Sequence, residues 1–208
     1  MAEHDLTQRP ALADILVPGR YGLAEGPPGL VVCERANLAL ASVIARKGQS
    51  GALSALVRSA YGIELPTSPR FAGGPTPEGR SITFVWSGAD QWLGCAEGAV
   101  DFEAELASAL GKRAMIADQS DGRCVLGLSG PRVREILAKG VGIDLHARVF
   151  KPGDVALTMV AHMGVHLWQL DERPTYEIAL FRSLAGSFWS WLSASAAEFG
   201  YEVVEDHR

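Results

Sequence analysis

The chain has 208 residues, which is long enough to bury a core in one domain or in two small lobes. Its content of 48% hydrophobic and 21% charged residues argues against a disordered protein. The net charge is -5 and the basic residues are scattered, so the basic stripe that nucleic-acid binding requires is missing. We therefore expect no nucleic-acid partner and, because no apolar run is long enough to cross a bilayer, no membrane contact.

The N-terminus and the cysteines indicate a cytoplasmic protein. The opening segment MAEHDLTQRPALADILVPGR carries acidic residues early and lacks the apolar stretch of a signal peptide. Cys33, Cys95 and Cys124 are odd in number and widely spaced, which is typical of reduced thiols and not of a disulfide framework.

Residues 1–36 are rich in proline and glycine, and we predict an N-terminal arm there with at most a short strand at residues 29–33. Such a segment cannot build a core of its own. It therefore lies along the rest of the chain or, as the alternative, along a partner subunit.

Residues 37–118 have the pattern of a first α+β lobe. Ser50 is a suitable cap for a helix that Gly62 would end, and residues 66–79 read as a surface loop. A turn at residues 88–90 joins two strands in a hairpin. The predicted order is a strand at 37–46, a helix from 50, strands at 81–88 and 91–97, a helix at 101–111 and a strand at 114–118. This order is that of the ferredoxin-like split βαβ unit.

Residues 119–208 nearly repeat that order as a second lobe. We expect two strands around Met163-Gly164, and a last helix whose apolar residues share one face. The predicted elements are a strand at 123–128, a helix at 131–139, strands at 154–163, 165–171 and 175–183, a helix at 184–199 and a strand at 201–205. The fold class is therefore α+β, with two similar ferredoxin-like lobes and largely antiparallel sheets.

Ser129-Gly130-Pro131 lies between a strand and a helix, where a phosphate-binding loop would also lie. The spacing matches neither a P-loop nor a dinucleotide fingerprint, so we interpret the segment as a structural turn with Pro131 at the first helical position. Arg132 and Arg134 then follow in the first turn, where positive charge opposes the helix dipole. They could reach an anion or an acidic partner, although a solvated helix face explains them equally well.

No other motif predicts a catalytic, cofactor or metal site. His162 and His166 have the i,i+4 spacing of zinc ligands, but the residues between them indicate a hairpin turn and not a helix. Asp118 and Asp121 lack the remaining positions of a calcium loop. We therefore expect no catalytic residue, no cofactor ligand and no metal ligand in this chain.

Two tryptophans are candidates for a contact surface. The strand that contains Trp168 carries apolar side chains on both faces, and both must be covered by helices of this chain or by another polypeptide. Trp189 lies near the edge of the apolar stripe of the last helix. Tryptophan is enriched at interfaces, so these two join Arg132 and Arg134 as candidate subunit-interface residues, beside a plain core role for each tryptophan.

The second half resembles the gamma subunit of heterotetrameric sarcosine oxidase. The resemblance rests on DQSDGRCVLGLSGPRVREILAKG, followed by IDLHARVFKPGDVALTMVAHMGVHLWQLDERPTYEIALFRSLAGSFWSWL. It covers about residues 116–201, and GRYG at 19–22 and QWL at 91–93 add weaker support.

The resemblance implies a subunit of a cytoplasmic complex with alpha, beta and delta partners. Such a complex oxidises the N-methyl group of sarcosine to give glycine, hydrogen peroxide and formaldehyde, or methylenetetrahydrofolate when tetrahydrofolate is present. The FAD, FMN and NAD would lie in the large chains and the zinc in the delta chain. The fold implied for the gamma chain is that of the folate-binding domain of glycine-cleavage aminomethyltransferase, without a cofactor of its own.

Three alternatives remain at this point, one of which is a pure assembly scaffold whose folate-type pocket is filled by side chains. The corresponding subunit of N-methylglutamate dehydrogenase would have the same layout, and substrate choice would lie in another chain. A free-standing folate-binding protein is a further alternative, but the K-G-C-Y-x-G-Q stretch of that class is replaced here by AKGVGIDLH.

Overall fold

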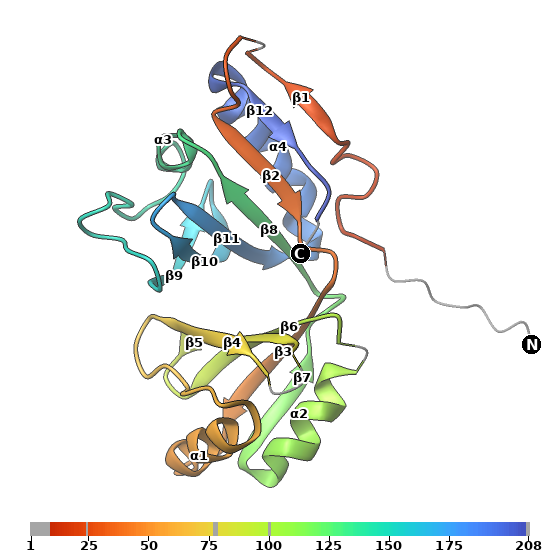
Figure 1. The fold of residues 1–208 in the computed structure, drawn as a ribbon, viewed down its shortest axis with the longest axis vertical. Coiled ribbons are helices and arrows are strands. Elements are labelled where there is room, and N and C mark those ends of the chain that lie inside the picture. The colour runs from red at the N-terminus through yellow and green to blue at the C-terminus, as the bar shows by residue number, and fades with distance from the viewer. Residues whose placement is uncertain (1–8, 24, 77–78, 100, 207–208) are drawn as a thin grey trace, which may run out of the picture.

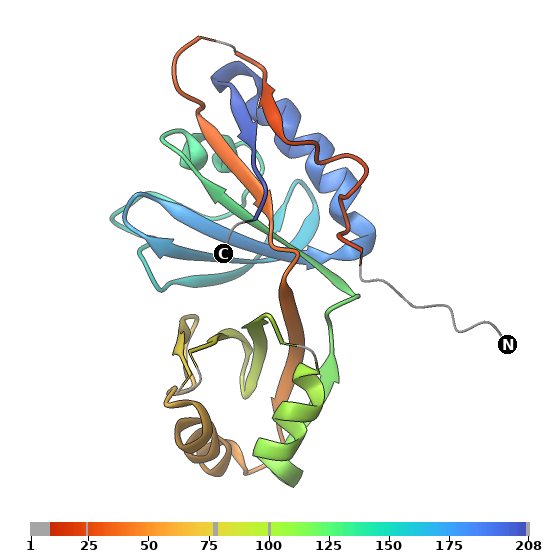
Figure 2. The ribbon, with the colours of Figure 1, turned by 45° about the vertical axis from the view of Figure 1, so that its right-hand side comes forward.

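The computed structural model describes residues 9–23, 25–76, 79–99 and 101–206, which form two lobes stacked along the long axis of the molecule (Figure 1). The chain crosses between the lobes between β2 and β3 and again between β7 and β8 (Figure 2). The described part of the chain contains no helix with the length and apolar character that crossing a bilayer would require.

The first lobe is a five-stranded antiparallel sheet with the strand order β4-β5-β6-β3-β7 and two helices on one face. Asp101 caps α2 by accepting a hydrogen bond of 3.1 Å from the Ala104 amide, and Gly62 ends α1 in the left-handed conformation, with φ of 70°. The elements are β3 (Leu38–Ala45), α1 (Ser50–Tyr61), β4 (Phe71–Pro75), β5 (Ser81–Gly88), β6 (Gln91–Glu97), α2 (Phe102–Leu110) and β7 (Ala114–Asp118).

The second lobe is a seven-stranded sheet with the order β1-β12-β2-β8-β11-β10-β9. All of its ladders are antiparallel except the pair of β12 and β2. The elements are β1 (Gly19–Tyr21), β2 (Leu30–Glu34), β8 (Arg123–Ser129), α3 (Val133–Ala138), β9 (Val155–Val160), β10 (Met163–Asp171), β11 (Thr175–Phe181), α4 (Ala185–Ala196) and β12 (Tyr201–Val203).

The two lobes are built on the same strand order, as predicted. Four neighbouring strands of the first lobe have the order β7-β3-β6-β5. The corresponding strands of the second lobe have the order β12-β8-β11-β10, with β2 inserted between β12 and β8. Both orders are that of the ferredoxin-like unit. The first lobe also has one extra edge strand, β4, and the second lobe has one at each edge, β1 and β9. The edges formed by β4 and β9 meet where the Phe71 amide donates to the Gly153 carbonyl at 3.1 Å and the Val155 amide donates to the Pro69 carbonyl at 2.9 Å.

Each sheet has an outer face covered by helices and an inner face turned toward the other lobe. The outer faces hold the two larger apolar cores, one with α1 and α2 and one with α3 and α4. The inner faces share a smaller core of nine buried side chains: Leu38, Leu40, Val85, Leu93, Cys95, Val125, Val155, Trp168 and Ala179. The result is a four-layer arrangement of helix, sheet, sheet and helix (Figure 1).

The N-terminal segment differs from the expected arm, because two of its stretches are strands of the second-lobe sheet. β2 inserts between β12 and β8, and Leu30 and Val32 are fully buried in the second-lobe core. Before them, Leu12 is also fully buried, and its amide donates to the Glu34 carboxylate at 3.0 Å. The density of proline and glycine at residues 25–29 therefore marks the connection between two strands and not an irregular arm.

Three local predictions are also corrected. Residues 66–79 are not wholly loop, because β4 pairs along β5 there. No side chain caps α1, whose N-cap residue is Gln49 and not Ser50. The hairpin between β9 and β10 turns at Ala161 and His162, with φ of 46° and 68°, instead of at Met163-Gly164. Two consecutive residues in the left-handed region give the turn whose twist matches an antiparallel hairpin.

Candidate functional site

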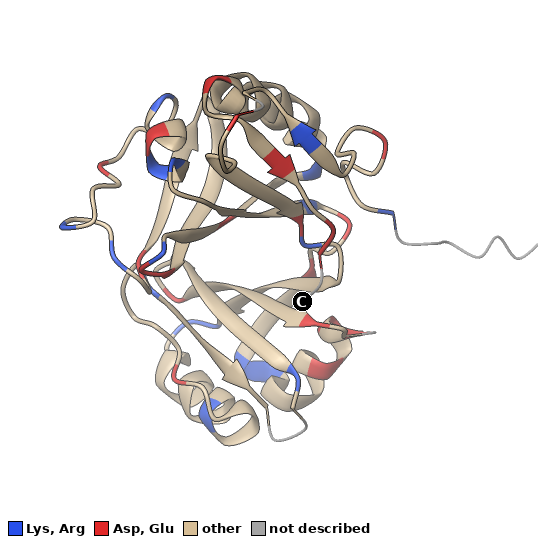
Figure 3. Ribbon diagram, turned by 45° about the horizontal axis from the view of Figure 1, so that its top comes forward, with Lys and Arg blue, Asp and Glu red and all other residues tan. Residues whose placement is uncertain are grey.

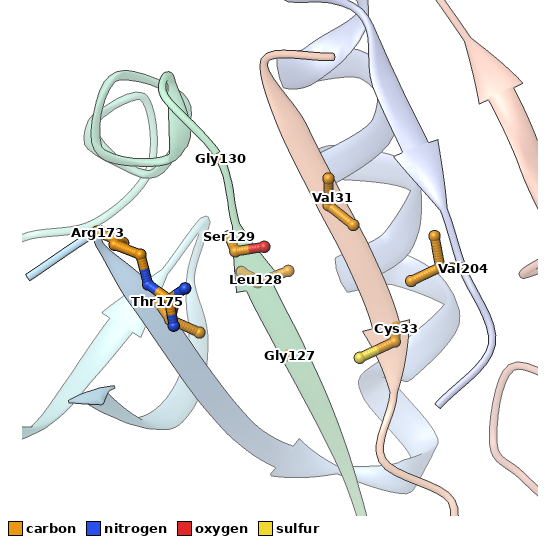
Figure 4. Close-up of a pocket in the computed structure, with 9 residues that line it drawn as sticks. All are labelled: Val31, Cys33, Gly127, Leu128, Ser129, Gly130, Arg173, Thr175 and Val204. Carbon is orange, nitrogen blue, oxygen red and sulfur yellow. The ribbon is translucent and has the colours of Figure 1, made fainter. Parts of the chain in front are cut away.

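A hollow in the second lobe lies on the part of the inner sheet face that the first lobe leaves uncovered. Its volume is about 420 Å³. Figure 4 shows side chains of β2 and Val204 on one side of it and those of Ser129, Arg173 and Thr175 on the other. The backbone of Gly127 and Gly130 completes the wall.

Two polar side chains that line this hollow, Arg173 and Thr175, donate to the carboxylate of Asp171. The Thr175 hydroxyl donates to the Asp171 carboxylate at 3.0 Å, and the Arg173 guanidinium donates to the same carboxylate at 3.0 and 3.3 Å. Burial acts to raise the pKa of Asp171, but these hydrogen bonds outweigh it and lower the pKa. Among the described lining residues there is no carboxylate, histidine or lysine, so the hollow offers no such acid or base to a bound molecule.

Ser129-Gly130-Pro131 connects β8 to α3, but Pro131 is not the first helical position as predicted, because α3 begins at Val133 with Arg132 as its N-cap. Gly130 has φ of 122°, and a Cβ atom there would lie 2.6 Å from the Gly29 carbonyl oxygen. That same oxygen accepts a hydrogen bond of 2.9 Å from the Arg132 amide, while the Val133 amide donates to Gly130. These two amides are thus bonded within the chain, one to Gly29 just before β2 and one to Gly130 of the turn itself, and neither is left for a phosphate.

The predicted turn between His162 and His166 is wrong, because Met163, Gly164 and Val165 belong to β10 and the turn lies at Ala161 and His162. The two histidine side chains nevertheless have different surroundings. His162 is exposed in the turn, whereas His166 lies on β10 with its Nε2 2.9 Å from the Ser87 hydroxyl of the first lobe. Within the described residues, no group of three or more His, Cys, Asp or Glu side chains could hold a metal ion.

His166 makes the contact between the lobes sensitive to acid. Burial, with the Arg123 charge as a second cause, lowers the pKa of His166 from 6.5 to about 4. Between these two values the unfolded chain binds a proton that the folded chain excludes, so stability falls as the pH drops through this window. From pH 7 to pH 5 we expect a loss of about 2 kcal/mol in the free energy of unfolding.

Urea titrations of the wild-type chain and of His166→Gln at both pH values measure this effect. Glutamine at position 166 keeps a polar group near Ser87 but does not titrate. Between pH 7 and pH 5 the variant should therefore lose about 2 kcal/mol less in the free energy of unfolding than the wild type does. Equal losses in the two proteins would show that His166 is not the acid-sensitive group.

Two of the cysteines are unsuited to nucleophilic chemistry. Burial raises the pKa of the Cys95 and Cys124 thiols well above its usual value, so neither forms a thiolate at neutral pH. Both, with Cys33, carry no disulfide. This agrees with the prediction of reduced thiols.

A buried ion cluster at the crossing between the lobes had no signal in the sequence. The Arg35 side chain is 4% exposed and bonds Glu177 of the second lobe, Glu97 of the first lobe at 2.5 Å, and Asp206 near the C-terminus at 3.1 Å. Burial acts to lower the pKa of Arg35, but the three carboxylates outweigh it and raise the pKa. The partners are far apart in sequence, 142 residues for Glu177, so only the fold brings them together.

The predicted interface residues are not gathered in one place. Trp168 is 1% exposed and is covered by the first lobe of the same chain, so the prediction that it meets a partner is corrected. Arg134 donates to the Tyr176 hydroxyl at 3.0 Å, and Arg132 pairs with Glu135 on the exposed side of α3. Trp189 is half-buried and lies edge-on to Tyr201, with ring centroids 5.7 Å apart.

Comparison with solved structures first defines the class of fold. Aminomethyltransferase T of the glycine cleavage system from Bartonella henselae superposes with a TM-score of 0.61 over 85% of this chain and 48% of that chain. The sequences are 15% identical, so this likeness shows the fold alone. The predicted aminomethyltransferase-like fold is confirmed.

Sequence comparison then gives the family. The model of the sarcosine oxidase, gamma subunit family matches residues 47–198, and the chain therefore belongs to that family. Sarcosine oxidase subunit gamma from Corynebacterium sp. (strain P-1) is 34% identical over 74% of each chain, and the one from Corynebacterium sp. (strain U-96) is 30% identical over 72% of each. These matches give no support to the N-methylglutamate dehydrogenase or free-standing folate-binding alternatives.

A solved complex matches nearly the whole chain. A chain of the heterotetrameric sarcosine oxidase from Corynebacterium sp. U-96, in complex with pyrrole 2-carboxylate, superposes with a TM-score of 0.75 and 26% identity. The match covers 92% of this chain and 95% of that chain. The resemblance stated from the sequence is thereby confirmed.

Proposed function

We propose that this chain is a non-catalytic subunit of a heterotetrameric sarcosine oxidase and works with alpha-, beta- and delta-type chains in the cytoplasm. The observation that carries the proposal is the match to a chain of that heterotetramer over almost the full length of both. The complex would oxidise the N-methyl group of sarcosine to give glycine, hydrogen peroxide and formaldehyde or methylenetetrahydrofolate.

The cofactors would be held by the other subunits. The hollow of Figure 4 supports this part of the proposal, because its hydroxyl of Thr175 and its guanidinium of Arg173 are occupied by Asp171. FAD, FMN, NAD, tetrahydrofolate and zinc would therefore belong to the partner chains. The charged residues of both signs are interspersed over the two lobes in Figure 3, which fits a protein partner better than a polyanion.

Co-purification tests the proposal. A tagged copy expressed together with the other subunits should recover flavin-bearing chains, visible by flavin absorbance and identified by mass spectrometry. The recovered complex should oxidise sarcosine, whereas the tagged chain alone should show no activity toward sarcosine and no binding of tetrahydrofolate.

Two results would contradict the proposal. Recovery of this chain alone from cells that contain all the subunits would contradict its assignment as a subunit. Turnover of sarcosine by the isolated chain would remove the non-catalytic role. Arg132, Arg134 and Trp189 stay as proposed contact residues until such a complex is mapped.

A further inference from the structure

The inner face of the second-lobe sheet continues beyond the region that the first lobe covers. Val155, Trp168 and Ala179 are buried against the first lobe. The next side chains on the same face of β9 and β11 are large and apolar, yet Leu157 is 44%, Met159 50% and Phe181 53% exposed. Scattered apolar side chains on a surface are ordinary, but a contiguous group on one sheet face indicates an interaction site.

These side chains form an open groove with Arg123 and His166 at one side. The groove has a volume of about 380 Å³. We call the set of Arg123, Leu157, Met159, His166 and Phe181 the inner-face groove. It is an open, largely apolar surface, unlike the enclosed pockets with converging polar groups that small molecules prefer.

Among the described residues that line this groove, Arg123 is the only charged one. Its guanidinium carbon lies 4.9 Å from the centre of the Phe181 ring, and its Nε is buried without a hydrogen-bond partner. Within the described ranges of the chain, no carboxylate forms an ion pair with it. Burying part of a guanidinium without a counter-charge costs desolvation free energy. A carboxylate from outside the chain would offset that cost by binding to it.

The surrounding groups leave that charge unbalanced. The described residues that line the groove include no aspartate or glutamate, and burial keeps His166 neutral at pH 7. Opposite the groove, Ser87 of the first lobe contributes a hydroxyl and not a charge. An occupant that supplies one carboxylate next to apolar side chains would therefore match the groove in both charge and hydrophobicity.

We propose that the inner-face groove binds an apolar polypeptide segment with one carboxylate, supplied by another subunit of the complex. The proposal rests on the assignment of this chain as a subunit. The carboxylate pairs with Arg123, and the apolar side chains of the segment cover Leu157, Met159 and Phe181. This names a contact surface distinct from the candidates on α3 and α4.

Two groove variants and one matched control test the proposal in the co-expressed complex. Phe181→Asp places a carboxylate beside Arg123, which satisfies the guanidinium internally and repels the carboxylate of the partner. Arg123→Gln removes the charge. Val149→Asp changes an equally exposed apolar residue, at 58%, next to Phe150, which packs into the core on the opposite sheet face.

We expect recovery of the flavin-bearing chains to fall at least about tenfold for both groove variants and to stay at the wild-type level for Val149→Asp. Circular dichroism and the thermal midpoint identify a variant that fails to fold. In that case Met159→Asp, on the rim of the groove, replaces it and is expected to lose recovery to the same extent.

The outcomes distinguish a failure of the groove proposal from a failure of the assignment of this chain as a subunit. If folded groove variants recover partner chains as well as the wild type does, the groove proposal is overturned and the assignment stands. If the wild-type chain recovers no partner, the assignment itself fails. If Phe181→Asp only converts a dimer of the isolated chain to a monomer, the occupant is a second copy and the proposal is overturned.

Discussion

Replacing Arg35 with alanine should destabilise the folded chain by about 3–5 kcal/mol, because it removes a buried positive charge that pairs with three carboxylates, two of them buried. Glu177 and Asp206 are 9% and 8% exposed at their side chains, so water cannot replace the lost guanidinium. The cluster joins β11, β6 and the C-terminal segment, and its loss should also weaken the contact between the lobes. Urea unfolding followed by far-UV circular dichroism measures the change.

Arg132→Ala is the matched control for this measurement. Its ion pair with Glu135 is about half exposed, at 52% for each side chain, and exposed pairs contribute about 1 kcal/mol or less. Adding Glu177→Gln to Arg35→Ala should recover part of the lost stability, since it removes one uncompensated charge. A loss below about 1 kcal/mol for Arg35→Ala would mean that the cluster does not hold the lobes together.

Trp168→Ala should cost about 3–5 kcal/mol in the free energy of unfolding, because it opens a cavity in the core between the two sheets. The side chain is 1% exposed and is the largest of the nine that make this core. We expect a lower midpoint in urea and, because Trp168 is the largest side chain in the core that the two lobes share, a transition that separates into two steps.

Trp189→Ala distinguishes this effect from the general cost of losing a tryptophan. Trp189 is half-buried at the edge of the second-lobe core, so we expect a loss of about 1–2 kcal/mol and a single transition. Equal losses for the two variants would argue that the core between the lobes is not a separate stabilising unit. Trp168→Phe should lie between them, because it retains part of the buried area.

The strand β2 shows where prediction from sequence reached its limit. Its five residues were expected at most as a short strand in an arm, and its local pattern carries no information on its neighbours. Its partners β8 and β12 lie far along the chain, and the parallel pairing with β12 becomes available only when α4 has returned the chain to that edge. The Arg35 cluster was missed for the same reason, because its members are far apart in the sequence.

For the candidate contact residues, too, the sequence predicted one part and the tertiary structure decided the other. Trp168 has a strand pattern with two apolar faces, which correctly predicted that both faces are covered. The pattern could not say by what, and the cover is the first lobe of the same chain. Conversely, Arg123 and Phe181 were predicted only as members of two separate strands. The pairing of β8 with β11 places the Arg123 guanidinium beside the exposed Phe181 ring.

The sequence by itself determined most of the elements, the strand order of the two repeated units and the family, because turns and alternation are local and the motif from Asp118 to Gly140 is long and ordered. Its spacing at Ser129-Gly130-Pro131 also argued against a phosphate-binding loop. Only the tertiary structure decided where β1, β2 and β12 pair, that the Gly29 carbonyl accepts the Arg132 amide, and which apolar faces remain open. Those outcomes depend on groups brought together from distant parts of the chain, and no local pattern encodes them.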